Sequence, residues 1–144
     1  MRFMILLKAD KDTEAGIMPG EQLLADMGKF NDELIAAGMM QAGEGLHPSA
    51  KGARVRFGKG GVSVTEGPFA PTGALLAGFW IWQLDSLQAA IAWVSKVPMP
   101  MPMASGEAEI EIRQIFAAAD FGDEFTPELR EQEERQRTAI AARL

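Results

Sequence analysis

The segment that most constrains the fold of this chain is residues 75–84, where apolar side chains occupy both faces of an extended strand. One face would present Leu76, Trp80, Trp82 and Leu84, and the other Leu75, Ala77, Phe79 and Ile81. A strand that is apolar on both sides belongs in the interior of a sheet, because each face has to be removed from water. We therefore expect a central strand, with helices covering one face and a second sheet covering the other.

The segments around this strand alternate between strand and helix periodicity. Alternating apolar residues predict strands at residues 2–8 and 108–113, and residues 39–47 are interpreted as a further strand, interrupted by Gly43 and Gly45. A helix over about 20–37 is predicted by apolar residues at helical spacing, namely Leu23, Met27, Phe30 and Leu34. Residues 10–20, between the first strand and this helix, are rich in turn-forming residues.

Two further elements complete the pattern. Residues 54–57 and 62–65 alternate around a glycine-rich turn and predict a β-hairpin. A second helix is expected to begin at an N-cap of Asp85 or Ser86 and to end before Pro98. Its predicted apolar face consists of Leu87, Ala90, Ile91 and Val94.

In chain order, these elements predict an α+β fold of the ferredoxin-like βαββαβ type with an added hairpin. The length of 144 residues suits one domain, which we expect at residues 1–117. Beyond it, Thr126-Pro127-Glu128 is a strong helix start, and a charged helix is expected to run to about residue 142. We assign residues 118–144 to a charged C-terminal helical extension, which has too few large apolar residues to be held by core burial.

Composition excludes several functional classes. The chain has no cysteine, which removes disulfides and cysteine nucleophiles and leads us to expect a cytoplasmic protein. A net charge of -6 argues against nucleic-acid binding, because phosphates require clustered positive charge. No apolar run approaches the roughly 20 residues of a membrane-spanning helix, so we expect no membrane contact. With a single histidine and no carboxylates at metal-site spacing, we predict no metal and no other cofactor.

Three short segments, taken in order, carry a family resemblance. They are Ala42-Gly43-Glu44-Gly45-Leu46, then Glu66-Gly67-Pro68-Phe69 leading into Leu76-Ala77-Gly78-Phe79-Trp80, and finally the strand at residues 106–113. Together they resemble the YCII-related, DGPF-motif family over about residues 1–117. The resemblance implies a ferredoxin-like domain that pairs into a dimeric α+β barrel, with two sheets packed face to face. It implies no established reaction.

The chain departs from this family within the turn motif. Glu66 stands where the family has aspartate, and the charged residues that usually follow the motif are replaced by Pro71, Gly73 and Ala74. The chemistry that those charged side chains would offer is therefore absent at these positions.

Three residues are candidates for catalysis. His47 is the only histidine, and imidazole titrates near neutral pH, which suits a general acid or base. Glu44 and Glu66 are candidate partners, because they are the acids within the family-like segments. Two of the three also have a structural explanation. His47 would be an exposed loop residue, and Glu66 would be a turn residue that accepts hydrogen bonds from backbone N–H groups.

Five residues are candidates for ligand binding. Arg54 and Arg56 are suited to an anionic substrate, although the solvated face of an alternating strand is the simpler explanation of this basic stretch. The aromatic candidates are Phe69, Trp80 and Trp82, which would line a pocket. Tryptophans on a sheet face belong more often to a core or a dimer interface, so that alternative stays open for Trp80 and Trp82.

Two function hypotheses follow from the sequence. The first is a small-molecule-binding protein, in its fuller form a cofactor-independent enzyme with His47 as acid or base. The alternative is a non-enzymatic dimeric interaction or regulatory module that docks a partner through the C-terminal helix. Both include a homodimer, because the two helices can cover only one face of strand 75–84. The Met-Pro run at residues 98–103 is interpreted as an extended loop. It would serve as a lid, as an adaptable groove for a partner, or as a plain linker.

Overall fold

The computed structural model describes residues 1–70, 75–99 and 108–144, which form two compact units, Met1–Gln114 and Ile115–Leu144. The larger unit contains, in order, β1 (Arg2–Lys8), α1 (Lys11–Glu14), α2 (Glu21–Ala36), β2 (Met40–Gly45), the 3-10 helix η1 (Ser49–Lys51), β3 (Ala53–Gly58), β4 (Gly61–Glu66), β5 (Leu76–Gln83), α3 (Leu87–Val94) and β6 (Ile110–Gln114). The smaller unit contains η2 (Ala118–Phe121) and α4 (Pro127–Ala141). Most of the Met-Pro run and all of residues 71–74 lie outside the described residues.

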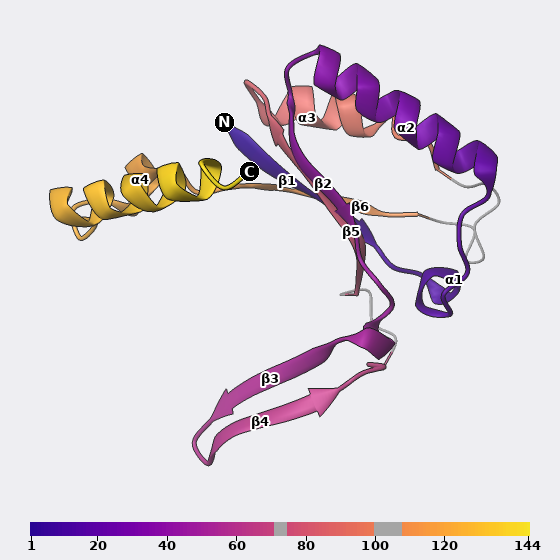
Figure 1. Cartoon of the computed structure of the whole chain (residues 1–144), viewed down its shortest axis with the longest axis horizontal. Helices are drawn as coiled ribbons and strands as arrows, with labels where there is room; N and C mark the ends of the chain where they lie inside the picture. The colour runs from indigo at the N-terminus through magenta and orange to yellow at the C-terminus, as the bar shows by residue number, and fades with distance from the viewer. Residues whose placement is uncertain (71–74, 100–107) are drawn as a thin grey trace. The chain divides into compact units, whose positions relative to one another are not determined.

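Four strands form an antiparallel sheet in the order β2-β5-β1-β6. The doubly apolar strand is β5, which is interior and pairs with both β1 and β2, as the sequence predicts. Helices α2 and α3 lie on one face of the sheet (Figure 1). This strand order and the two covering helices are those of a ferredoxin-like fold, so the predicted ferredoxin-like α+β architecture is confirmed.

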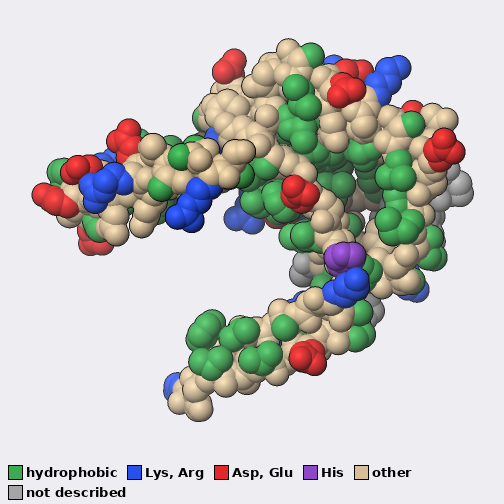
Figure 2. Space-filling view, viewed as in Figure 1, with side chains coloured by type: hydrophobic (Ala, Val, Ile, Leu, Met, Phe, Trp, Pro, Cys, Tyr) green, Lys and Arg blue, Asp and Glu red, His purple; other side chains and the backbone are tan. Residues whose placement is uncertain are grey.

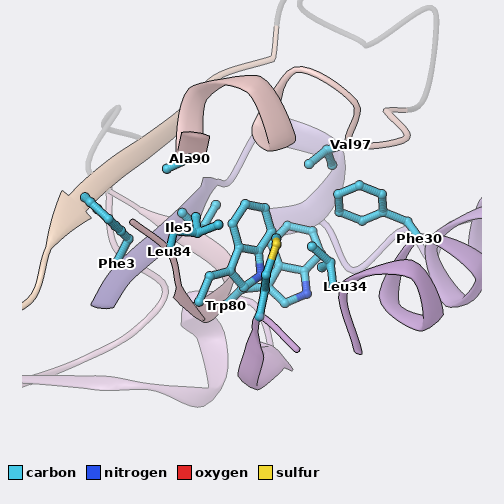
Figure 3. Packing of buried hydrophobic residues seen from close by; sticks show 10 residues of the cluster. Phe3, Ile5, Phe30, Leu34, Trp80, Leu84, Ala90 and Val97 are labelled. Atoms are coloured by element: carbon cyan, nitrogen blue, oxygen red, sulfur yellow. The ribbon is translucent and has the colours of Figure 1, made fainter. Parts of the chain in front are cut away.

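The core lies between the sheet and α2 and α3. The fully buried residues Phe3, Ile5 and Trp82 come from the strands, and Leu34 comes from α2. Figure 3 shows these layers meeting around Trp80, whose Nε1 donates a hydrogen bond of 3.0 Å to Asn31 Oδ1. The core is therefore a single apolar cluster built across the helix-covered face of the sheet.

The buried face of helix α3 is rotated from the predicted one but shares Ala90 and Val94 with it. Leu87 and Ile91 are 48% and 46% exposed, whereas Ala90 is buried and Trp93 packs against the core. The ring of Trp93 lies 6.3 Å from that of Phe30. Trp93 offers more apolar surface than either aliphatic residue, so the rotation of the helix that packs this side chain inward is favoured.

The turn-rich segment after β1 contains the short helix α1, which the sequence analysis did not predict. Asp10 caps it by accepting from the Thr13 backbone N–H at 2.8 Å, and Thr13 Oγ1 accepts from the Asp10 N–H at 2.8 Å. This reciprocal pair is a capping box. It fixes the start of α1 and so the direction in which Glu14, the last residue of the helix, points.

Strands β3 and β4 form the predicted hairpin, closed by the two-residue turn Lys59-Gly60. Gly61, directly after the turn, has a φ of 109°, a conformation that glycine adopts without strain. The hairpin extends from the sheet on the side away from α2 and α3 (Figure 1). Every residue of both strands is exposed.

The smaller unit is organised around aromatic residues. Phe121 lies between Phe116 and Phe125, with 5.1 Å between ring centroids on each side. Arg130 of α4 stacks on Phe125 and donates from Nε to the Phe125 carbonyl at 2.9 Å. Helix α4 itself buries no residue. Among the described residues, no helix is both long and apolar enough to cross a membrane.

Gly43 and Gly45 of β2 offer a matched test of the packing between β2 and the core. A Cβ atom at Gly43 would lie 2.5 Å from Trp80 Cδ1 and 2.9 Å from Met40 Cε, whereas one at Gly45 would meet nothing within 4 Å. We expect Gly43→Ala to lower the free energy of unfolding by about 1–3 kcal/mol, because the buried Trp80 ring has to move. Gly45→Ala should change it by less than about 1 kcal/mol. Urea denaturation followed by tryptophan fluorescence measures the free energy of unfolding of both variants. Equal losses in the two variants would contradict the close packing of Gly43 against Trp80.

Candidate functional site

Side chains with functional chemistry gather where the hairpin leaves the sheet. The chain enters the hairpin through His47 and η1, and it leaves through Gly67-Pro68-Phe69, in which the Gly67–Pro68 bond is cis. The Gly67 N–H donates to the Gly52 carbonyl at 2.9 Å, so the two connections lie side by side. Figure 2 shows the only histidine, in purple, at this junction. We call residues 46–54 and 66–70 the hairpin root.

Ser49 holds the hairpin root together. Glu14 accepts two hydrogen bonds from Ser49, from its backbone N–H at 3.1 Å and from its hydroxyl at 2.5 Å. The Ser49 Oγ in turn accepts from the Phe69 N–H at 3.0 Å. The hydroxyl–carboxylate bond has the length of a charge-assisted hydrogen bond. We call Glu14, Ser49 and Phe69 the root clasp, because they join α1, η1 and the segment after β4.

Gly67 fits beside the clasp only because it has no side chain. A Cβ atom there would lie 1.7 Å from the Ser49 carbonyl oxygen, far inside van der Waals contact. The glycine of the turn motif is therefore required by this close approach of two backbones.

Arg54 and Phe69 are two candidate ligand-binding residues that the structure brings together. The guanidinium carbon of Arg54 lies 4.0 Å from the centroid of the Phe69 ring. Among the described residues, neither Arg54 nor Arg56 forms an ion pair. Arg56 lies two residues further along the same face of β3, opposite Ser63. Stacking therefore orients the charge of Arg54 and leaves its N–H groups for a ligand.

His47 and Glu66 both belong to the hairpin root and both are exposed. Within the described part of the chain, neither side chain forms a hydrogen bond or an ion pair with another residue. Glu66 pairs with Ala53 in the hairpin and so lies on the face opposite to Arg54. An acid–base pair of His47 and Glu66 stays a prediction.

The remaining candidates lie on the sheet. Glu44 pairs with Phe79 and therefore lies on the sheet face that α2 and α3 do not cover. Trp80 and Trp82 lie on the other face, where they are 5% and 0% exposed and pack with Phe30. Their positions are those of core residues, the alternative that the sequence left open. The structure thus separates Glu44 from the two tryptophans.

Sequence reasoning missed the root clasp, in which Glu14 of α1 binds Ser49. The capping pattern of Asp10 and Thr13 contains a signal for α1, and hence for an ordered Glu14. No sequence pattern connects Glu14 to Ser49, because the two residues are 35 positions apart and meet only in the folded chain.

The arrangement supports two chemical tasks. Arg54 can bind an anionic group, and His47 can exchange a proton with solvent or with a bound molecule. Across residues 1–70, 75–99 and 108–144, no cluster of three or more histidine, aspartate or glutamate side chains could hold a metal ion.

The clasp can be tested by its effect on the hairpin. In Ser49→Ala, the Phe69 N–H loses its acceptor and Glu14 loses a donor. We expect amide hydrogen exchange in β3 and β4 to become about tenfold faster, because a lost hydrogen bond of this kind costs about 1–2 kcal/mol. Exchange in β1 and β5 should change much less. Ser63→Ala, at an exposed position of β4, is the control; a similar acceleration in both variants would show that Ser49 does not hold the hairpin.

Comparison with known proteins agrees with this architecture. The family model described as the YCII-related domain matches residues 1–116, a span that includes every described strand and the hairpin root. A search of curated proteins gave no match. The match confirms the resemblance that was predicted from the glycine-rich segment and from Glu66-Gly67-Pro68-Phe69.

Proposed function

The chain belongs to the YCII-related domain family, and from this premise we propose that it is a small-molecule-binding protein whose ligand site is the hairpin root. Arg54 holds a small organic anion, and His47 acts on it as acid or base without a cofactor. The observation that carries the proposal is the stack of Arg54 on Phe69. We place the protein in the cytoplasm, because a chain without cysteine has no disulfide that its reducing conditions could break.

The anionic character of the ligand follows from the environment of Arg54. The chain has a net charge of -6, yet this arginine has no acidic partner among the described residues. Phe69, on which it stacks, is bound through its backbone to Ser49. An arginine held in place loses less conformational entropy when it binds a carboxylate or phosphate in bidentate fashion. This preorganisation favours a ligand role for Arg54 over that of a freely moving surface charge.

The proposed chemistry is proton transfer by His47. Its exposed imidazole follows β2 directly and belongs to the same root as Arg54. Glu66 and Glu44 remain the candidate partners that would orient it. Positioning a bound anion beside an acid or base is the part of catalysis that such a site supplies.

We expect small anions to change the NMR signals of His47, which need no assignment because there is only one histidine. A panel of small carboxylates and inorganic phosphate serves as the probe. Arg54→Gln should weaken the best-binding anion at least tenfold, in line with about 1.5–3 kcal/mol for hydrogen bonds to charged groups. Arg56→Gln should have little effect, since Arg56 lies on the same face of β3 without the stack on Phe69. Equal losses in both variants, or no response to any anion, would overturn the proposed site.

We further propose that the protein is a homodimer. Helices α2 and α3 cover one face of the sheet, and the opposite face carries the half-buried residues Met4, Leu6, Phe79 and Ile81. We call this the open sheet face. The sheet of a second copy, packed face to face, would cover it at the roughly 10 Å spacing of stacked sheets.

The alternative function, an interaction module that docks through α4, is supported by one observation. Helix α4 buries no residue, and Leu129 and Ile140 on it are 45% and 63% exposed. A partner that packs against α4 would cover these two side chains.

Removal of residues 121–144 separates the two functions. We expect the shortened protein to keep a cooperative thermal transition and a free energy of unfolding within about 1 kcal/mol of the full chain, because the segment contributes little apolar burial. The response of His47 to anions should also persist. Loss of the cooperative transition would show that the segment is integral to the domain; loss of the anion response in a folded protein would favour the module.

A further inference from the structure

One face of the hairpin is apolar and exposed. Val55, Phe57, Val62 and Val64 are 52%, 80%, 64% and 63% exposed. The register pairs Val55 with Val64 and Phe57 with Val62, so all four side chains lie on the same face. Figure 2 shows hydrophobic side chains gathered along the hairpin. We call these four residues the hairpin face.

A hairpin with such a face is not stable by itself. An isolated two-stranded hairpin is at best marginally stable in water, and this one has every strand residue exposed. The root clasp fixes one end of the hairpin and leaves the apolar side chains further along it in water. The hairpin face therefore needs a cover that the described residues do not supply.

The size of the hairpin face fits an interface between two copies. Multiplying each exposed fraction by the ordinary surface area of a valine or phenylalanine gives an exposed area of roughly 500 Å² per chain for the four residues. This area is close to that of the largest apolar patch of a typical monomer. Two copies of this patch give about 1,000 Å², the lower limit of a specific interface. Adding the open sheet face of both copies brings the total into the range of stable dimers.

The arginines of the hairpin do not oppose such an interface. Arg54 and Arg56 pair with Thr65 and Ser63 and lie on the face opposite to the four apolar residues, so packing of the hairpin face buries neither charge.

We infer that the hairpin is a dimerisation arm whose apolar face packs against a second copy of this chain, beside the two open sheet faces that pack on each other. The inference rests on the proposed homodimer and adds the element that forms its interface. The exchange is reciprocal, because each copy carries one hairpin and one open sheet face, and a two-fold axis closes the assembly. The hairpin root is the base of this arm, so the second copy also orders the proposed ligand site.

Phe57→Ser tests the arm, with Thr65→Ser on the opposite face of the hairpin as the matched control. Phe57 is the most exposed of the four residues, so its loss should leave the circular dichroism and the thermal transition of the domain intact. Sedimentation equilibrium should show the dimer dissociation constant of Phe57→Ser raised at least thirtyfold, as for a central aromatic residue of an interface. Thr65→Ser should stay within about threefold of the natural chain, since it changes an exposed position away from the interface.

The outcomes separate the arm from the dimer. A dimer that Phe57→Ser leaves unweakened would overturn the arm and keep the homodimer, which would then form through the sheet alone. A natural chain that is monomeric at micromolar concentration would overturn both, and the hairpin face would then belong to another partner.

A spin label provides a second measurement that does not depend on affinity. The chain has no cysteine, so Ser63→Cys places a single label on the hairpin, on the face opposite to the apolar residues. Docked arms give one narrow distribution of distances between the two labels of a dimer. A broad distribution in a sample that is fully dimeric would show that the arms are free and would overturn the inference.

Discussion

The pairing of β5 with β1 on one side and β2 on the other determines most of the larger unit. The side chains of β5 are apolar on both faces, so this strand is stable only where both of its faces are removed from water. On one face, Trp80 and Trp82 form the core with α2 and α3. On the other face, Phe79 and Ile81 lie beside Met4 and Leu6, and this second surface is the one that the proposed homodimer would cover.

The hairpin root links this sheet to the proposed function. Glu14 and Ser49 bind the entry and exit of the hairpin to α1, and Phe69 extends this clasp to Arg54. One set of contacts thus orients both an exposed hairpin and an arginine that has no ion-pair partner among the described residues. If the hairpin face packs against a second copy, ligand binding at the root and dimerisation act on the same backbone, and each would influence the free energy of the other.

Much of the fold could be predicted from local patterns. Strand and helix periodicities, the Ser86 cap, the Thr126-Pro127 helix start and the Lys59-Gly60 turn each depend on neighbouring residues, and the structure contains each of them. Helix α1 was not predicted, and of the predicted face of α3 only Ala90 and Val94 lie in or against the core. The formation of α1 depends on a reciprocal cap within a turn-rich segment. The orientation of α3 depends on whether Leu87, Ile91 or Trp93 packs against Phe30.

The sequence by itself determined the ferredoxin-like α+β class, the family, and the presence of an arginine pair, one histidine and a turn motif. Only the tertiary structure decided which of these lie together. It stacked Arg54 on Phe69, set Glu66 on the opposite face of the hairpin, and buried Trp80 and Trp82 against α2. The physical reason is the separation in sequence over which each interaction acts. Periodicity and capping act over a few residues, whereas the hydrogen bond from Ser49 to Glu14 joins residues 35 positions apart. It forms only once the fold has brought α1 and η1 together.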